Sequence, residues 1–222
     1  MYTFIYMLNY QSHTESLRLN EENLIVGANY IANRDHELAQ VLVQYGYPPL
    51  WKRTATFSTL VHIILEQQVS LASANATYNR LNNLLQQHIS PHSLLTLKEE
   101  ELKNIGFSRQ KVQYAHNLAT QIVENKINLE ELDRLSDNQV KQELKKLKGI
   151  GDWTADIFLS ECLLRTNILP KGDIAMLEAF KLLKNLEKRP DHEQFVQGTL
   201  HWQPWRSVGT RMLWHFYLSR KR

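Results

Sequence analysis

Two helical patterns meet at a Gly-Ile-Gly turn in the stretch Leu144-Lys145-Lys146-Leu147-Lys148-Gly149-Ile150-Gly151-Asp152-Trp153-Thr154-Ala155. The two glycines allow positive φ angles and the close approach of another chain. The amides of the turn, and those that open the second helix, are expected to point outward, and the helix dipole adds to their charge. The stretch therefore predicts an anion site, surrounded by lysines at positions 141, 145, 146 and 148.

A backbone phosphate of nucleic acid suits such a turn, because amides carry no information about base sequence. Between the glycines, Ile150 can fill the space between the two helices. A Gly-x-Gly turn by itself is common and favours a helix connection that only packs. The combination with Leu147, Thr154 and Ala155 is rarer and resembles the helix-hairpin-helix DNA-binding motif.

The composition sets limits around this stretch. The chain has 222 residues, a formal net charge of +3 and a pI near 8.9, which hints only weakly at a polyanionic partner. Its length suits one large domain or two small lobes. The single cysteine, Cys162, excludes a disulfide scaffold and any four-cysteine zinc or iron–sulfur site. No apolar run suits a membrane span and no signal peptide is recognised, so we expect a cytoplasmic protein.

Apolar residues recur every three or four positions along most of the chain, and alternating strand patterns are absent. Ser70 and Ser108 are suited to cap helices. The segments Thr96-Leu97-Lys98-Glu99 and Ser136-Asp137-Asn138-Gln139 have the pattern of capping boxes. The sequence therefore predicts an all-α fold of many short helices.

A second motif follows the hairpin, in the form Leu169-Pro170-Lys171-Gly172-Asp173, with its aspartate 22 residues beyond Gly151. A hairpin followed at this distance by a Gly/Pro-rich loop and an aspartate resembles the helix-hairpin-helix–GPD DNA glycosylases, and most of all the 3-methyladenine DNA glycosylase II type. Three further stretches share the resemblance: Ile63-Ile64-Leu65-Glu66-Gln67-Gln68-Val69-Ser70, Gly106-Phe107-Ser108-Arg109-Gln110-Lys111 and Trp202-Gln203-Pro204-Trp205-Arg206-Ser207.

The resemblance implies two helical lobes flanking a DNA-binding cleft in a monomer. Residues 57–173 are expected to form a central lobe that carries the helix-hairpin-helix at about 137–165. Residues 21–56 and 174–222 are expected to form the other lobe, and residues 1–20 a tail or short strand. The N-terminal β-domain of the 3-methyladenine glycosylase II type is expected to be missing or vestigial.

Asp173 is the candidate catalytic residue. An N-glycosylic bond breaks through an oxocarbenium-like transition state, which a carboxylate beside the sugar can stabilise. The alternative role of Asp173 is the N-cap of a helix over 174–183, and both roles can hold together. Lyase-type relatives carry a lysine where this chain has Trp153, so the resemblance implies a monofunctional enzyme without a Schiff base. No cofactor is required.

The resemblance also implies a pocket for a flipped-out base, formed by Trp153, Trp214, Ile157 and Ile174. The two indoles suit a cationic alkylated base through stacking and cation–π attraction. The two isoleucines stand where better-known members carry tyrosines, so the pocket is expected either to be less aromatic or to use Trp51 or Phe107 instead. Trp205 is expected in the core.

DNA contacts are expected from Gly149, Ile150, Gly151, Thr154, Lys148, Gln68 and Ser70. By resemblance, Gln68 stands at the position that wedges into the duplex. The backbone carbonyls of Lys145, Leu147 and Gly149 are expected to hold a structural monovalent cation. Further positive charge is expected from Arg206, Arg211 and the terminal Arg220-Lys221-Arg222.

The sequence thus predicts a glycosylase that excises alkylated purines from double-stranded DNA containing a damaged base. Two alternatives stay open. The first is a non-catalytic helix-hairpin-helix module that senses lesions, and the second is a glycosylase for uracil or hypoxanthine. Asp173 and the pair Trp153 and Trp214 discriminate against the first, because a pure binding module needs none of them.

Overall fold

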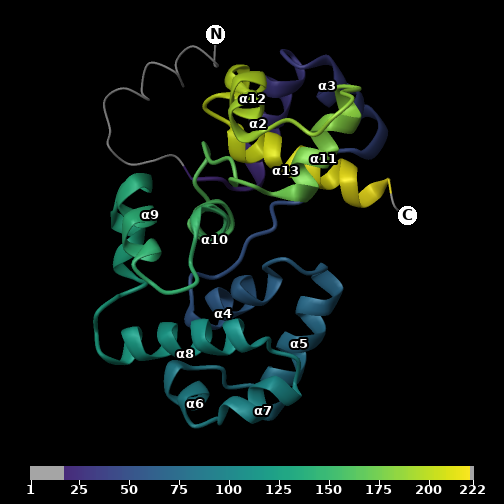
Figure 1. Ribbon diagram of the computed structural model, residues 1–222. Helices are drawn as coiled ribbons and strands as arrows, with labels where there is room; N and C mark the ends of the chain where they lie inside the picture. Colours follow the sequence, from purple (N-terminus) through teal and green to yellow (C-terminus); the bar gives the residue numbers. More distant parts are fainter. Residues whose placement is uncertain (1–17, 221–222) are drawn as a thin grey trace.

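The computed structural model describes residues 18–220 (Figure 1). Within this range the backbone is helical, and its β pairing is limited to one isolated antiparallel bridge between Arg18 and Arg165. The predicted all-α class is therefore confirmed. The expected tail or strand lies, up to residue 17, outside the described residues. No helix between residues 18 and 220 is both long and apolar enough to cross a membrane.

The helices of the first two thirds of the chain are short and follow one another closely. They are α2 (Glu21–Ala32), α3 (His36–Tyr45), α4 (Phe57–Glu66), α5 (Leu71–Leu84), α6 (Pro91–Leu95), α7 (Glu99–Asn104), α8 (Arg109–Val123), the 3-10 turn η2 (Glu131–Arg134), α9 (Asp137–Lys145) and α10 (Asp152–Ile157). The remainder comprises the π-helix η3 (Phe158–Cys162), α11 (Ile174–Leu183), α12 (His192–Gly198), the 3-10 turn η4 (Leu200–Trp202) and α13 (Arg206–Ser219).

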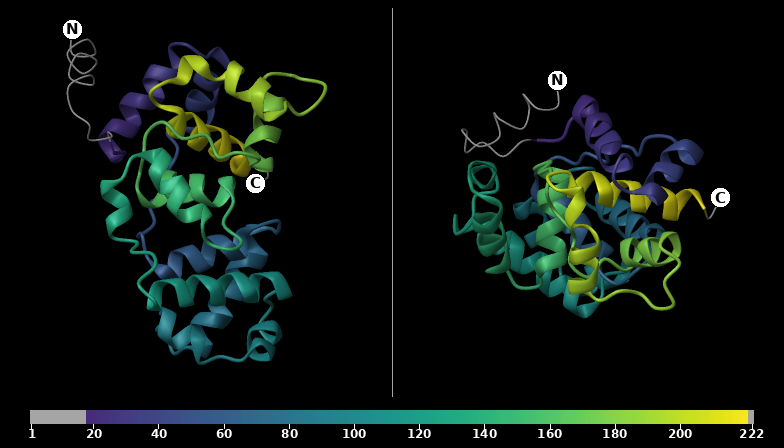
Figure 2. Two further views of the ribbon diagram at one scale, coloured as in Figure 1. Left: turned by 60° about the vertical axis from the view of Figure 1, so that its left-hand side comes forward. Right: turned by 90° about the horizontal axis from the view of Figure 1, so that it is seen from above.

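Two separate clusters of buried apolar side chains hold these helices. The central cluster runs from Phe57 to Ile168 and packs α4 to α10 together. The terminal cluster joins α2 and α3 to α11, α12 and α13. Helices α4 to α8 lie at one end of the molecule and the helices of the terminal cluster lie at the other, with α10 between them (Figure 1, Figure 2). Leu164 and Leu169 pack in the terminal cluster, so the chain between the hairpin and α11 contributes to both; the division at 56/57 and 173/174 stays a prediction.

The helix starts follow from local capping. The hydroxyls of Ser70, Ser108 and Ser136 each accept a hydrogen bond from the amide three residues later, as the sequence predicts. The capping box predicted at Thr96 is wrong, because Thr96 ends α6. Instead Lys98 is the N-cap of α7, and the Glu101 carboxylate accepts a hydrogen bond from the Lys98 amide.

A buried charged network fastens the chain where it passes between the clusters. Arg53 bonds both carboxylate oxygens of Glu66, at 2.9 and 3.1 Å, and its Nε lies 2.6 Å from Glu161 on the π-helix. Arg211 donates to the carbonyls of Leu50 and Ser160, at 2.8 and 2.7 Å. Burial raises the pKa of Glu161 to about 7, against the opposing charge of Arg53.

Candidate active site around Asp173

Asp173 is the N-cap of α11 and also the meeting point of two indoles. Its Oδ1 accepts hydrogen bonds from the Met176 amide at 2.8 Å and from Trp214 Nε1 at 3.2 Å. Its Oδ2 accepts from Trp153 Nε1 at 2.9 Å. The residue is 8% exposed, and no lysine, arginine or histidine among residues 18–220 forms an ion pair with it. Both roles considered from the sequence are thus compatible, because one carboxylate caps the helix and faces the indoles.

The loop before Asp173 is a tight turn. The Asp173 amide donates to the Pro170 carbonyl at 3.3 Å, and Gly172 has a φ of 79°. A non-glycine residue would be strained in this left-handed conformation. A Cβ on Gly172 would meet no atom within 4 Å, so the backbone angle and not the space calls for glycine. The sequence Pro-Lys-Gly-Asp therefore delivers the carboxylate at the start of α11.

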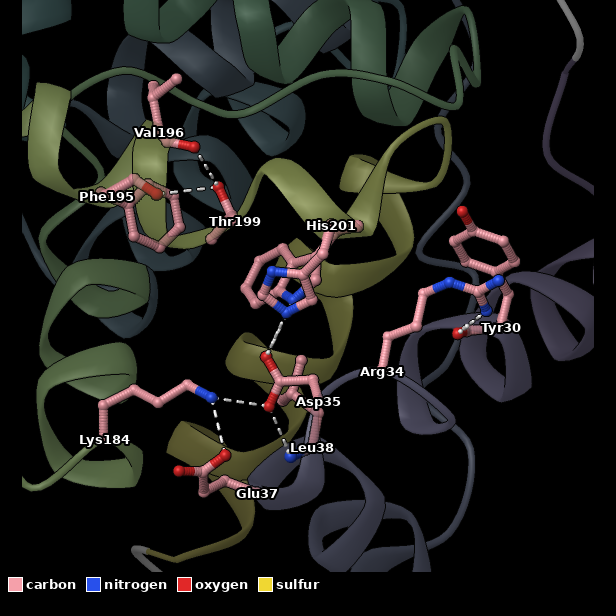
Figure 3. A network of polar contacts seen from close by, with 11 residues as sticks. Tyr30, Arg34, Asp35, Glu37, Leu38, Lys184, Phe195, Val196, Thr199 and His201 are labelled. Carbon is pink, nitrogen blue, oxygen red and sulfur yellow. Dashed lines mark hydrogen bonds and ion pairs between the residues drawn. The ribbon is translucent and has the colours of Figure 1, made fainter.

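Asp35, shown in Figure 3, offers a useful comparison, because it is a second buried N-cap aspartate. Its Oδ2 accepts from Trp202 Nε1 at 2.9 Å and lies 3.1 Å from His201 Nε2. Its Oδ1 is bonded to Lys184 Nζ at 2.8 Å, and that ammonium also reaches Glu37 at 2.7 Å. Burial raises the pKa of Asp35, but the bonds from Lys184 and Trp202 lower it further, so the net pKa lies below its usual value.

The structure brings only part of the predicted base pocket together. Trp153 and Trp214 meet at Asp173, and Trp51 packs edge-on against Trp214 with ring centroids 6.2 Å apart. Ile157 is buried, whereas Ile174 is 66% exposed on the first turn of α11. Phe107 belongs to the central cluster, and Trp205 is buried in the terminal cluster as predicted. The third ring near the site is therefore Trp51.

Of the two hairpin glycines, Gly149 has the predicted positive φ, whereas Gly151 has a φ of −100°. Gly149 has a φ of 88°, and a Cβ there would overlap the ring of Tyr114. A Cβ on Gly151 would meet no atom within 4 Å, so this side of the turn is open. The amides of residues 151 to 154 have no acceptor among residues 18–220, as expected at the start of α10. The open face of the hairpin is thus a set of unpaired backbone donors.

The lysines around the hairpin are not free, which corrects the sequence interpretation. Lys145 pairs with Asp152, and Lys146 pairs with Glu143 at 2.6 Å. Lys141 binds Asp156 at 2.5 Å. The backbone amide of Lys148 donates to Asn117 on α8 at 3.0 Å, and its ammonium contacts Gln113 at 3.3 Å. Acidic and amide side chains on α8, α9 and α10 therefore offset much of this local positive charge.

Other predicted DNA contacts are also turned inward. The side chain of Ile150 is buried in the central cluster. Thr154 is 2% exposed, and its hydroxyl accepts a hydrogen bond from Gln67 Nε2 at 3.0 Å. Only the backbone of these two residues can face DNA. Asp152 is the first residue of α10, whose N-cap is Gly151. The hydrogen bond from Lys145 lowers the pKa of Asp152, and burial opposes this effect.

The turn between α4 and α5 places Gln68 at its tip. Gln68 is exposed and has a φ of 58°, while its neighbours Val69 and Leu71 are 45% and 51% exposed. Ser70 caps α5, and its hydroxyl accepts from the Ser73 amide at 3.2 Å. Gln67 points the other way and donates to the Gly149 carbonyl at 2.9 Å. This bond ties the tip to the hairpin.

The predicted cation site stays a prediction. The Leu147 carbonyl accepts a hydrogen bond from the Ile150 amide at 3.1 Å, and the Gly149 carbonyl accepts from Gln67. Each oxygen keeps one lone pair for a further partner. No group of three or more acidic, histidine or cysteine side chains that could hold a metal occurs in residues 18–220.

The arginines expected to reach DNA are placed differently. Arg211 is 0% exposed and serves the network between the clusters. Arg206 bonds Asn167 at 2.9 Å. Arg220 lies at the end of α13, and residues 221 and 222 are outside the described range. Of these side chains, Arg211 is excluded from a DNA surface.

Comparison with protein families assigns the fold and its motifs. Residues 61–204 match the model of the HhH-GPD superfamily base excision DNA repair proteins. This range contains the hairpin, Asp173 and the turn with Gln68. Because the match covers more than half of the chain, the protein belongs to this superfamily.

Individual relatives lie at low identity. DNA-3-methyladenine glycosylase 1 of Schizosaccharomyces pombe is 26% identical over 161 residues, covering 71% of each chain. A DNA-3-methyladenine glycosylase of Bacillus subtilis is 24% identical over 169 residues, covering 71% of this chain and 56% of the relative. The chain spans 71% of the length of the first of these relatives and 56% of the second. It spans 64% of the length of a further Bacillus subtilis protein.

Solved structures agree on the fold. A Schizosaccharomyces pombe 3-methyladenine DNA glycosylase, determined in complex with abasic DNA, superposes with a TM-score of 0.78 at 23% identity, covering 85% of this chain and 94% of that one. A DNA-3-methyladenine glycosidase from Bacillus halodurans gives a TM-score of 0.70 at 26% identity, covering 88% and 90%. The chain is therefore related to the 3-methyladenine type of DNA glycosylase.

Sequence reasoning missed two residues beside the site. Asp156 on α10 accepts a hydrogen bond from the Lys171 amide at 3.0 Å, and Gln67 bonds the hairpin. Asp156 follows Asp152 by four residues, as Lys145 follows Lys141. Residues four apart share one face of a helix, so this matched spacing was the available signal.

Proposed function

We propose that this protein is a monofunctional DNA glycosylase that flips out and excises alkylated purines of the 3-methyladenine type. One observation supports it most: Asp173 is held by two indole N–H groups and a helix start, and no cationic side chain of residues 18–220 pairs with it. A DNA-binding module needs no such carboxylate. The neighbouring hairpin offers unpaired amides for a DNA phosphate.

In the proposed reaction the bond between the sugar C1′ and the base nitrogen breaks, and its electron pair leaves with the base. Positive charge grows on the sugar, where the carboxylate of Asp173 stabilises it. Water then adds to C1′ and releases a proton to Asp173 or to solvent. An N-alkylated purine already carries positive charge and leaves as a neutral base, so no strong general acid is required.

The side chains around Asp173 suit this division of work. Trp153 and Trp214 orient the carboxylate through their N–H groups and offer ring faces that attract a cationic base. Trp153 stands at the lyase lysine's position, so no Schiff base forms there and the product is an abasic site. Gln68, with the apolar Val69 and Leu71 beside it, would enter the space left by the flipped base.

Base release from duplex DNA tests the proposal. We expect wild-type protein to release 3-methyladenine and 7-methylguanine from methylated duplexes and to leave unmodified duplexes intact. Asp173→Asn keeps the helix cap but removes the charge, so release should fall by about a hundredfold or more. DNA binding by the wild type without release of any alkylated base would overturn the enzyme assignment. Release of uracil or hypoxanthine in preference to alkylated purines would overturn the substrate class.

The hairpin allows a separate test of the phosphate contact. Gly151→Ala fills open space with an allowed φ of −100°, so the protein should keep its stability. The added methyl group should hinder the phosphate and weaken binding about fivefold for every duplex sequence. Binding titrations with two unrelated sequences check this. A loss of binding confined to one duplex sequence would contradict a backbone contact. The variant Gly149→Ala, in contrast, should unfold the hairpin.

A further inference from the structure

Asp156 is a fully buried carboxylate outside the set of residues assigned to the reaction. It lies on α10, one helical turn after Asp152, and it is 0% exposed. One oxygen, Oδ1, lies 2.5 Å from Lys141 Nζ on α9. The other, Oδ2, accepts a hydrogen bond from the backbone amide of Lys171 at 3.0 Å. The second contact is the informative one, because Lys171 precedes Asp173 by only two residues.

The turn that carries Asp173 needs an external acceptor at this point. The bond from the Asp173 amide to the Pro170 carbonyl closes the turn. The Lys171 amide lies at the second position of the turn and has no acceptor inside it. Asp156 supplies that acceptor from α10. The same helix holds the carboxylate of Asp173 through Trp153, so α10 fixes the loop at its backbone and at its functional end.

A buried charge at this position is not the arrangement that stability alone favours. Burial raises the pKa of Asp156, and the contacts with Lys141 and with the Lys171 amide oppose this effect. Well-packed apolar residues often replace buried ion pairs without loss of stability. An apolar side chain, however, offers no acceptor to the Lys171 amide. The carboxylate therefore serves the geometry of the loop.

We infer that Asp156 is a positioning residue, which fixes the Pro170–Asp173 turn through the Lys171 amide and thereby aims Asp173 at the sugar. The inference rests on the proposed glycosylase function for its effect on rate. Asp156 touches neither substrate nor reacting atoms. Its removal should therefore slow base release and leave DNA binding unchanged.

Three substitutions at this position separate positioning from stability. Asp156→Ala and Asp156→Leu both remove the acceptor, and Leu fills the space so that the protein stays folded if Ala does not. Asp156→Asn keeps an oxygen for the Lys171 amide, while Lys141, which is 33% exposed, can turn to solvent. Leu102→Ala in α7 is the matched control, because it opens a cavity in the central cluster away from the loop.

Single-turnover base release, DNA affinity and hydrogen exchange at residues 169–173 are measured for each variant. Ala and Leu should slow release about tenfold or more, because misplacing a reacting group by an ångström has effects of this size. Their DNA affinity should stay within about twofold, since no DNA contact is removed. Exchange at the Lys171 amide should accelerate. Asn should recover release to within about threefold of wild type.

Two results would overturn the inference. The first is an unchanged exchange rate of the Lys171 amide in Asp156→Leu and Asp156→Ala. The second is a rate of base release in these variants equal to that of Leu102→Ala at matched stability. If wild type releases no alkylated base, the proposed function fails instead, and the exchange measurement alone decides whether Asp156 holds the turn.

Discussion

Asp35 and Asp173 occupy the same local position in two different settings. Each is the buried N-cap of a helix, and each accepts a hydrogen bond from an indole N–H. At Asp35 the Lys184 ammonium completes the site at 2.8 Å (Figure 3). At Asp173 the further donors are neutral: a second indole and the Met176 amide. The charge of Asp35 is therefore paired with an ammonium, whereas the donors that bind Asp173 carry no charge.

The difference separates a structural aspartate from the proposed catalytic one. A carboxylate paired with lysine attracts a developing cation only weakly, because the positive charge of the ammonium offsets its negative charge. Neutral N–H donors stabilise and orient a carboxylate without cancelling its charge. Because both residues are helix N-caps, capping by itself does not distinguish a structural aspartate from a catalytic one. The compensating cation, present at one and missing at the other within residues 18–220, is what distinguishes them.

The largest expected effect is on the rate of base release. Asp173→Asn should lower it by about a hundredfold or more. Asp35→Asn, measured well below its unfolding temperature, should stay within about twofold of wild type, because distant sites act independently. Single-turnover release from methylated duplex DNA measures both. A comparable loss of rate in the two variants would contradict this distinction, because the loss in Asp173→Asn could then not be assigned to a carboxylate beside the sugar.

Stability should show the opposite order. Asp35→Asn removes one partner of a buried ion pair and should lower the free energy of unfolding by about 3 kcal/mol at neutral pH. Because the folded pKa of Asp35 is lowered, its contribution is present above the unfolded pKa of 3.8 and is lost as the pH falls through the folded value. Asp173→Asn keeps an equally good cap and should change stability by less than about 1 kcal/mol.

Denaturant unfolding at pH 7 and at pH 3 checks this second prediction. The difference between wild type and Asp35→Asn should shrink at the lower pH. A loss that is the same at both values would show that Lys184 does not act through the charge of Asp35.

Much of this arrangement was predictable from local sequence. The all-α class, the hairpin and most helix starts depend on residues within one or two turns of each other, such as Ser136 and its amide partner at Gln139. The roles of Asp173, Trp153 and Trp214 at one site came from family resemblance, and the structure brings these side chains together. Short-range patterns carried these predictions because capping and turn chemistry are local.

The errors arose where a side chain's partner lies far along the chain. Arg211 was expected at the DNA surface, yet it bonds the Leu50 carbonyl, 161 positions away. For Lys148 the contact with DNA stays a prediction, while its backbone amide bonds Asn117 on α8, which is 31 residues away. A net charge taken from the composition treats every lysine and arginine as unpaired. Only the packing of α8, α9 and α10 reveals which charges are already paired.

Glu161 extends this comparison, because it is a buried carboxylate whose pKa is raised to about 7 although a cation lies beside it. Its pKa of about 7 lies above the unfolded value of 4.5, so the group stabilises the fold below pH 4.5 and this contribution is lost as the pH rises through 7. Glu161→Gln avoids the burial of charge. Its stability relative to wild type should therefore improve by about 2 kcal/mol between pH 5 and pH 8.5.

Unfolding curves of both proteins at the two pH values measure this effect. Arg53 keeps its two bonds to Glu66 in the variant, so it is not left unpaired. A relative stability that falls with rising pH would mean that Arg53 holds Glu161 ionised, as Lys184 holds Asp35.

The smallest expected effect concerns the indole donors. Trp153→Phe keeps a ring beside Asp173 but removes one N–H bond to Oδ2, and Trp202→Phe makes the same change at Asp35. A single hydrogen bond contributes about 1 kcal/mol, so Trp153→Phe should slow base release about fivefold with little change in stability. Trp202→Phe should lower stability and leave the rate unchanged. If Trp153→Phe instead lost as much rate as Asp173→Asn, the indole would act in the reaction itself and not only in holding the carboxylate.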